Sequence, residues 1–286
     1  MAGVGNASPI PATATPLRVL SLGAGVQSTA MLLMGLAGTF GAPPDVALFA
    51  DSGWEPRHVY AHLDWLTATV APFPILRVSR GSLRDDLLAA TAGRKQRVAN
   101  PPYFVKKLRG KPGMLKRRCT GEYKIALLDR ATLQLLREHG RAVAEKWIGI
   151  SLDEIERMKP AAHPRFVHRY PLVEHGIARS PGNRFARDDC ISWLTRHGYP
   201  EPPKSACVGC PYHDDAYWRM LKTRCPVEWA DAVAMDAAIR RGLPGVRGEA
   251  YLHRSRKPLA EVDFSTAAER GQTDLFGDEC SGLCGV

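Results

Sequence analysis

The sequence predicts an α/β fold in which a parallel sheet carries helices on both faces, followed by a helical, cysteine-bearing C-terminal part. Three observations lead to this prediction. Short apolar runs alternate with amphipathic stretches of helical length, a glycine-rich turn follows the first apolar run, and the cysteines come later in the chain. Such alternation is typical of parallel strands joined by crossover helices. At 286 residues, the chain is long enough to bury a sizeable core.

Apolar periodicity places the individual elements. The expected strands are residues 17–22, 45–50, 75–78 and 146–150. The expected helices are residues 29–38, 55–70, 123–139, 187–197, 214–222, 226–241 and 265–270, with a polar loop or short helix at 153–159. The carboxyl ends of parallel strands meet at one edge of a sheet, where ligands bind. The glycine turn after the first strand and Asp51 after the second are both expected at that edge.

The chain divides into four parts by composition. We expect a disordered leader at 1–16, an α/β core at 17–160, a metal-binding continuation at 161–225, and a helical extension with a flexible tail at 226–286. The leader lacks the basic and apolar regions of a secretory signal. No run of about 18 apolar residues follows it, so no membrane span is expected. These features predict a cytoplasmic protein.

Basic residues gather in one segment of a chain whose net charge is +10. From Lys106 to Arg118 there are seven lysines and arginines and no acidic residue. The surrounding residues 93–118 show little periodicity, which favours a mobile basic loop. Such a loop can hold tRNA or DNA by its phosphates. A solvated run of charge is the alternative.

The glycine turn is a candidate phosphate site. A glycine-rich turn between a strand and a helix points backbone N–H groups at an anion, and the helix dipole favours negative charge there. The turn lacks the Gly-Lys-Ser/Thr ending of a Walker A loop and the third glycine of a dinucleotide fingerprint, and an unliganded turn remains the alternative. The predicted nucleotide-binding residues are Ser21, Gly23, Ala24, Gly25, Val26, Gln27, Ser28, Thr29, Asp51, Ser52 and Gly149.

Cysteines form the second candidate site. Cys207 and Cys210 form a C-x-x-C pair beside Gly209 and Pro211, which is typical of a metal-chelating turn. Thiolates hold iron–sulfur clusters and structural zinc alike. The seven cysteines of the chain are an odd number, which favours metal or catalytic roles over disulfides. A buried free thiol is the alternative for each single cysteine.

Four segments, in order, carry a family resemblance over about residues 17–220. Ser21 to Thr29 resembles the PP-loop of the adenine-nucleotide α-hydrolase superfamily, and the most similar branch is the phosphoadenosine phosphosulfate (PAPS) reductase family. The other segments are Phe49-Ala50-Asp51-Ser52-Gly53, Arg118-Cys119 with Lys124, and the Cys207–Cys210 pair. The resemblance implies a PP-loop (HUP-like) fold and a bound adenine nucleotide, either ATP or an adenylyl sulfate, with magnesium as an accompanying ion. Gln27 stands where ATP-using members have Asp.

The same resemblance implies a [4Fe–4S] cluster, with zinc as the alternative. Its ligands would be Cys119, Cys207 and Cys210, with Cys190 as the candidate fourth. If only three of them ligate, one iron stays open, as expected of related tRNA-thiolating enzymes.

The sequence leaves three functions open, and the resemblance implies the first two. The first is sulfonucleotide reduction, in which Cys280 attacks sulfur, Cys284 resolves, Lys124 grips oxyanions and an electron donor completes the cycle. A second metal-binding tail or a disordered tail is the alternative for the two cysteines. The second is ATP-dependent thiolation of a tRNA or DNA base, which needs a sulfur donor. The third is a non-catalytic protein that binds nucleotide or nucleic acid and contains structural zinc.

Overall fold

The computed structural model describes residues 15–107, 111–174, 185–266 and 269. The chain forms two compact units whose segments interleave along the sequence. The first unit comprises Met1–Ala50, His58–Val78 and Ala126–Ser205; the second comprises Asp51–Arg57, Ser79–Ile125 and Ala206–Val286. The predicted parts were contiguous, and the compact units are not.

The first unit contains the predicted parallel sheet. Its strand order is β3-β2-β1-β6-β7. β1 pairs in parallel with β2 and with β6, and β6 pairs in parallel with β7. The strands are β1 (Leu17–Leu22), β2 (Val46–Asp51), β3 (Ile75–Ser79), β6 (Ala144–Ile148) and β7 (Phe166–Arg169). The strand order reverses between β1 and β6, so these two strands flank the topological switch point where such sheets bind ligands.

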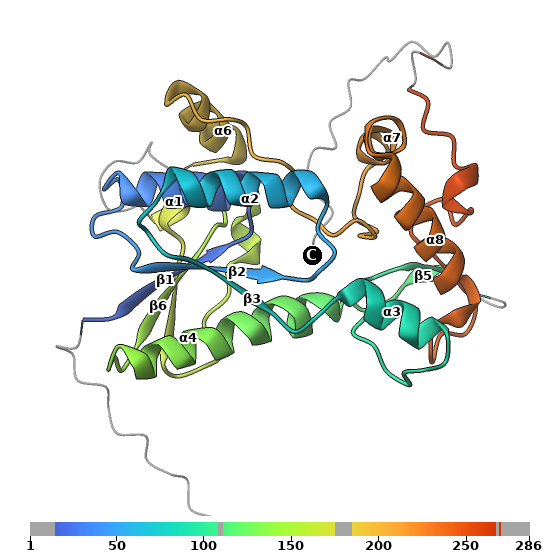
Figure 1. Ribbon diagram of the computed structural model, residues 1–286, viewed down its shortest axis with the longest axis horizontal. Coiled ribbons are helices and arrows are strands. Elements are labelled where there is room, and N and C mark those ends of the chain that lie inside the picture. The colour runs from blue at the N-terminus through green and yellow to red at the C-terminus, as the bar shows by residue number, and fades with distance from the viewer. Residues whose placement is uncertain (1–14, 108–110, 175–184, 267–268, 270–286) are drawn as a thin grey trace, which may run out of the picture. The chain divides into compact units, whose positions relative to one another are not determined.

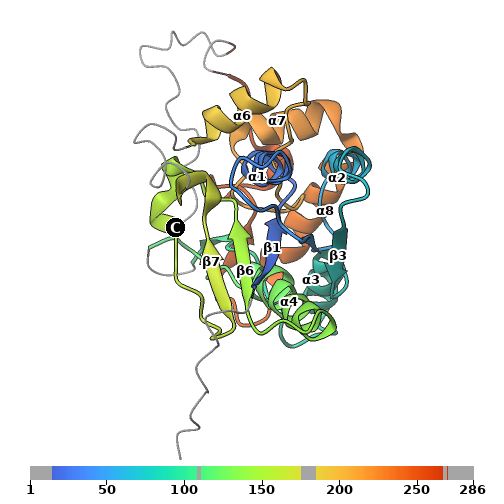
Figure 2. The ribbon, with the colours of Figure 1, turned by 90° about the vertical axis from the view of Figure 1, so that its left-hand side faces the viewer.

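Helices cover both faces of this sheet, as predicted. Figure 1 shows α1 (Val26–Leu36) and α2 (Arg57–Thr69) on one face and α4 (Ala126–Glu138) on the other, and Figure 2 shows the same layers from a second side. α6 (Arg187–Arg196) packs against α1. Alternate strand residues serve the two faces: Leu20 and Phe49 join the core under α1 and α2, whereas Val19 and Leu48 join the core over α4.

The described residues of the second unit form a small antiparallel sheet and three α-helices. Its helices are α3 (Leu83–Thr91), α7 (Asp215–Arg224) and α8 (Pro226–Gly242), and its sheet has the order β5-β4-β8, with strands Gly113–Met114, Phe104–Lys106 and Glu249–Tyr251. α8 packs against α3, α7 and β8. Ser82 and Asp214 begin α3 and α7 by accepting hydrogen bonds from the Asp85 and Tyr217 backbone N–H groups.

Several elements differ from the predictions. β4 and β5 lie in the segment predicted as a mobile loop, because strands of three and two residues are too short to show a period. α3, β7 and β8 were not predicted. α1 begins three residues before the predicted helix and β6 two residues before the predicted strand, whereas the 3₁₀ helix Leu152–Arg157 confirms the short helix.

The end of the described chain departs from the prediction as well. Within the predicted helix 265–270, Ser265 and Thr266 are not helical, and residues 267, 268 and 270 lie outside the described residues. None of the described helices combines the length and the apolar character needed to cross a membrane.

Candidate functional site

The glycine loop of the first unit lies at the switch point. It joins β1 to α1, and its Ala24 has a φ of 58°, the left-handed conformation that alanine rarely adopts. Ser28 closes the loop, because its hydroxyl accepts from the Gly23 N–H at 3.1 Å and donates to the Gly25 carbonyl at 3.3 Å. Gly25, at the N-cap of α1, supplies no side chain for capping. The first turn of α1 therefore presents backbone N–H groups suited to an anion.

The end of β6 comes close to this loop. A Cβ on Gly149 would lie 3.1 Å from the Ser28 nitrogen and 3.3 Å from the Gln27 carbonyl carbon, so only glycine fits without a backbone shift. The Gln27 side-chain amide donates to the Ser151 hydroxyl at 3.4 Å. The predicted residues from Ser21 to Thr29 are thus brought together with Gly149.

Thr29 supports the loop from beneath. Its side chain is fully buried, and its hydroxyl lies 3.1 Å from the Nε2 atom of His62 on α2. Burial lowers the pKa of His62. The Thr29 hydroxyl, predicted to bind nucleotide, is directed at this neutral imidazole inside the core.

Three predicted metal ligands of the second unit lie near one buried tyrosine. Burial, and then negative charge on Cys119, Cys210 and Cys207, raises the pKa of Tyr103. Tyr103 is fully buried, and its hydroxyl has no hydrogen-bond partner among the described residues. Burial also raises the pKa of each thiol, that of Cys210 to about 11. We call Cys119, Cys207 and Cys210, together with Tyr103 and the polar side chains beside the thiols, the thiol centre.

The C-x-x-C turn is held by a tryptophan. The Val208 N–H donates to the Trp54 carbonyl at 2.9 Å, and the Cys210 N–H donates to the Cys207 carbonyl at 3.0 Å. A Cβ on Gly209 would lie 2.0 Å from the Trp54 ring, which leaves room for glycine alone. Trp54 Nε1 in turn donates to Asp231 of α8 at 2.6 Å. The turn is therefore anchored to the core of the second unit.

An ion pair with a buried carboxylate adjoins the thiol centre. Lys124 Nζ lies 3.1 Å from Glu55 Oε1, and the Glu55 side chain is fully buried. Burial lowers the pKa of Lys124, but the charges of Glu55 and Cys207 outweigh it, so the pKa is raised. Lys124 lies on a single π-helical turn, Gly121–Ile125, whose Tyr123 hydroxyl donates to Asp86. Such turns are frequent at functional sites.

Ser52 belongs to this centre. Its hydroxyl lies 3.1 Å from Cys207 Sγ and donates to Glu55 Oε1 at 3.2 Å. Asp51, also predicted to bind nucleotide, accepts from the Gly53 N–H at 2.7 Å, which tightens the turn leading to Glu55. Both residues fall in the segment Asp51–Arg57 of the second unit.

Cys190 lies elsewhere. It is fully buried in the apolar core of the first unit, on the helix that packs against α1. Burial, with a smaller effect of Asp189, raises its pKa to about 12. This is the environment of a core thiol, and Cys190 belongs to the first unit whereas the thiol centre belongs to the second. Cys280 and Cys284 lie outside the described residues.

Sequence reasoning missed two residues of the centre, Glu55 and Tyr103. Glu55 follows the Asp51-Ser52-Gly53 turn and precedes a proline, which placed it at a predicted helix start. Tyr103 follows two prolines in the segment interpreted as a loop. Among the described residues, no three histidine, cysteine, aspartate or glutamate side chains lie close enough together to hold a single metal ion. Cluster ligands differ from such a group, since each thiolate binds a different iron.

Comparison with known proteins finds a distant likeness among solved structures alone. No protein-family model matches the sequence, and no curated protein matches it. Among solved structures, the U34-tRNA thiolase NcsA from Methanococcus maripaludis with its [4Fe-4S] cluster is similar to this chain, with 14% sequence identity and a TM-score of 0.36. The match covers 78% of this chain and 72% of that chain.

Proposed function

We propose that the protein is an enzyme of sulfur transfer, with an adenine nucleotide at the glycine loop of the first unit and a [4Fe–4S] cluster at the thiol centre of the second. The observation that carries the proposal is the distribution of the cysteines over the two units: Cys119, Cys207 and Cys210 lie near Tyr103 within the second unit, and Cys190 is enclosed in the core of the first. A cluster held by three thiolates leaves one iron able to accept a small ligand such as sulfide.

The thiol centre fits such a group. Glu55 Oε2 and the Tyr103 hydroxyl are buried polar atoms without a hydrogen-bond partner in the described residues, which is costly unless a bound group faces them. The three thiols have raised pKa values. Metal binding must therefore release their protons, and the Lys124 charge beside Cys207 favours the thiolate form.

The glycine loop supports the nucleotide half of the proposal. Its backbone N–H groups and the N-terminus of α1 suit a phosphate, and Gly149 lets the end of β6 approach the loop. In the proposed reaction, the carbonyl oxygen of an acceptor attacks the α-phosphorus of ATP and pyrophosphate leaves. Sulfide from an external donor then replaces that oxygen, and AMP leaves. No electron is transferred, so no reductant is consumed.

Anaerobic purification of the full chain tests the proposal first. We expect a brown protein with about four irons and four sulfides. Cys119→Ser and Cys207→Ser should lose the iron, whereas Cys190→Ala should keep it. Cys225→Ser is the matched control, because this half-buried thiol of the same unit contacts Met220 instead. A colourless, zinc-only protein would overturn the cluster.

Turnover then separates the two chemistries. Sulfur transfer requires pyrophosphate release from ATP that depends on an acceptor and on sulfide. Release of sulfite from an adenylyl sulfate, lost in Cys280→Ser, would instead establish sulfonucleotide reduction and overturn our proposal. Both assays use the same anaerobic preparation, so a negative result in one cannot be ascribed to a missing cluster.

A further inference from the structure

Two neighbouring cavities in the second unit form one basic groove. The larger, of about 740 Å³, is lined by Val105, Lys107, Gly113, Met114, Leu115, Gly245, Val246 and Arg247. The smaller, of about 480 Å³, shares Leu115, Gly245 and Val246 with it. We call the two together the basic groove. It lies between the β4–β5 hairpin and the turn that joins α8 to β8.

The charge of the basic groove has one sign. Five of its lining residues are lysine or arginine and none is acidic; they are Arg97, Lys107, Lys116, Arg118 and Arg247. All five are exposed. Arg97 pairs with Glu122, and the other four make no ion pair with any residue that the structure describes. Four uncompensated cations around one groove favour a polyanionic ligand.

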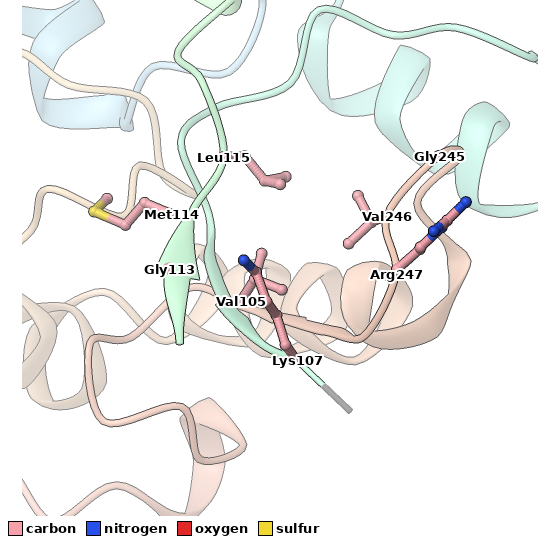
Figure 3. Close-up of a pocket in the computed structure, with 8 residues that line it drawn as sticks. All are labelled: Val105, Lys107, Gly113, Met114, Leu115, Gly245, Val246 and Arg247. Atoms are coloured by element: carbon pink, nitrogen blue, oxygen red, sulfur yellow. The ribbon is translucent and has the colours of Figure 1, made fainter. Parts of the chain in front are cut away.

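Leu115 and Val246 make part of the groove apolar, and we call this part its floor. Figure 3 shows the Leu115 and Val246 side chains directed toward one another across the larger cavity, with Val105 and Lys107 beside them. Leu115 and Val246 are partly buried against the core of the second unit. A duplex cannot lay the faces of its bases on this surface, since they are stacked inside it. An apolar floor beside exposed cations therefore fits a single strand, whose bases are free to contact it.

Backbone hydrogen bonds connect the residues that line the basic groove to residues of the thiol centre. The Asn100 carbonyl accepts from the N–H groups of Arg118 at 3.1 Å and Cys119 at 3.3 Å. The Asn100 amide donates to the Lys116 carbonyl at 3.3 Å. On the floor, the Leu115 N–H donates to the Tyr103 carbonyl at 2.9 Å. The cationic wall and the floor are thus each joined to a residue of the centre.

We infer that the basic groove binds a single-stranded polynucleotide, with its phosphates on the cations and one base against Leu115 and Val246. This inference names the acceptor of the proposed function. Only the role of the polynucleotide as acceptor rests on that function. Binding itself requires neither ATP nor turnover.

Fluorescence anisotropy with the anaerobically purified full chain tests the inference. The probes are labelled oligouridylate, oligothymidylate, a duplex of equal length and inorganic polyphosphate. We expect at least one single strand to bind tenfold more tightly than the duplex and the polyphosphate. Preference for uridylate or thymidylate identifies RNA or DNA as the source. Equal affinity for polyphosphate, equal affinity for the duplex, or no binding at low salt would overturn the inference.

Variants locate the contact. Lys116→Ala and Arg247→Ala should each reduce the slope of log affinity against log salt by about 0.7, the value for one phosphate contact in a single strand. Arg130→Ala, an exposed arginine of α4 in the first unit, is the control and should leave the slope unchanged. Val246→Thr keeps the side-chain shape and should weaken binding without changing the slope, since it alters the apolar floor alone. Unchanged binding in all three groove variants would overturn the site.

Two results separate this inference from the proposed function. Tight binding of a single strand by a protein that cleaves no ATP would support the inferred groove and contradict the proposed function. ATP cleavage that depends on a polynucleotide but is unaffected in a Lys116→Ala/Arg247→Ala double variant would support the proposed function and contradict the inferred groove.

Discussion

Lys124 Nζ lies 3.1 Å from Glu55 Oε1, and the same carboxylate oxygen accepts a hydrogen bond from Ser52. Cys207 Sγ is 3.5 Å from it. One buried carboxylate, that of Glu55, thus contacts the Lys124 ammonium group, the Ser52 hydroxyl and the Cys207 thiol. Its second oxygen has no partner among the described residues. The lysine is the group that balances this buried charge.

Replacing Lys124 with methionine should destabilise the cluster-free protein by about 2 kcal/mol, because it leaves the Glu55 carboxylate buried without its counter-charge. The loss is smaller than for a fully enclosed pair, since the Lys124 side chain is 35% exposed. Urea unfolding measures the loss. The Lys124→Met/Glu55→Gln double variant should recover much of it, and strictly additive losses would contradict the coupling.

Gly209→Ala should disrupt the C-x-x-C turn. The new methyl group would overlap the Trp54 ring, which its hydrogen bond to Asp231 holds in place. We expect a loss of unfolding free energy of about 3 kcal/mol or more, from overpacking in a rigid site, together with loss of bound iron. Iron content and urea unfolding give the two readouts.

Trp54→Leu supplies the matched test of that cause. In the Gly209→Ala/Trp54→Leu double variant the smaller side chain makes room for the methyl group, so iron binding should return in part relative to Gly209→Ala. If the double variant binds no more iron than the single variant, the clash with Trp54 is not the reason for the defect.

Much of the first unit could be predicted from the sequence, and less of the second. β1, β2 and α1 form from contiguous apolar runs whose spacing is visible in the chain. β4 pairs with β8 across more than 100 residues, and β4, β5 and β8 are all too short to show a period, so tertiary packing defines them. Interleaving of the two units likewise arises from contacts between distant segments.

The candidate site shows the same limit. Spacing identified Cys207 and Cys210, because a C-x-x-C turn carries its chemistry locally. Cys190 has no such local pattern, and a thiol in an amphipathic helix can serve a core or a ligand set equally well. Glu55 and Tyr103 became visible only when folding brought them beside the thiols.

Gly149→Ala should weaken nucleotide binding about tenfold, equal to roughly 1.4 kcal/mol. The added methyl group would press on the backbone of Gln27 and Ser28, which must shift and so disturb the glycine loop. Gly121→Ala is the control, since a Cβ there meets no atom within 4 Å. Calorimetric titration with ATP measures the effect. Unchanged affinity in a correctly folded Gly149→Ala protein would remove this loop as the nucleotide site.

His62 should make the first unit sensitive to acid. Burial lowers its folded-state pKa below the ordinary value of 6.5. As the pH falls through 6.5 toward the folded pKa, the unfolded chain takes up a proton that the folded chain does not, so stability present above 6.5 is progressively lost. Below the folded pKa, the Thr29 hydroxyl under the glycine loop would also lose its neutral partner.

His62→Gln should therefore reduce the difference in unfolding free energy between pH 7.5 and pH 5, because glutamine keeps a polar partner for Thr29 and does not titrate. Urea unfolding of the cluster-free protein at the two pH values measures that difference. His139→Gln, at an exposed position after α4, removes a histidine without altering the core and should leave the difference unchanged. An equal difference in the wild type and in His62→Gln would show that this imidazole is not what makes the first unit acid-sensitive.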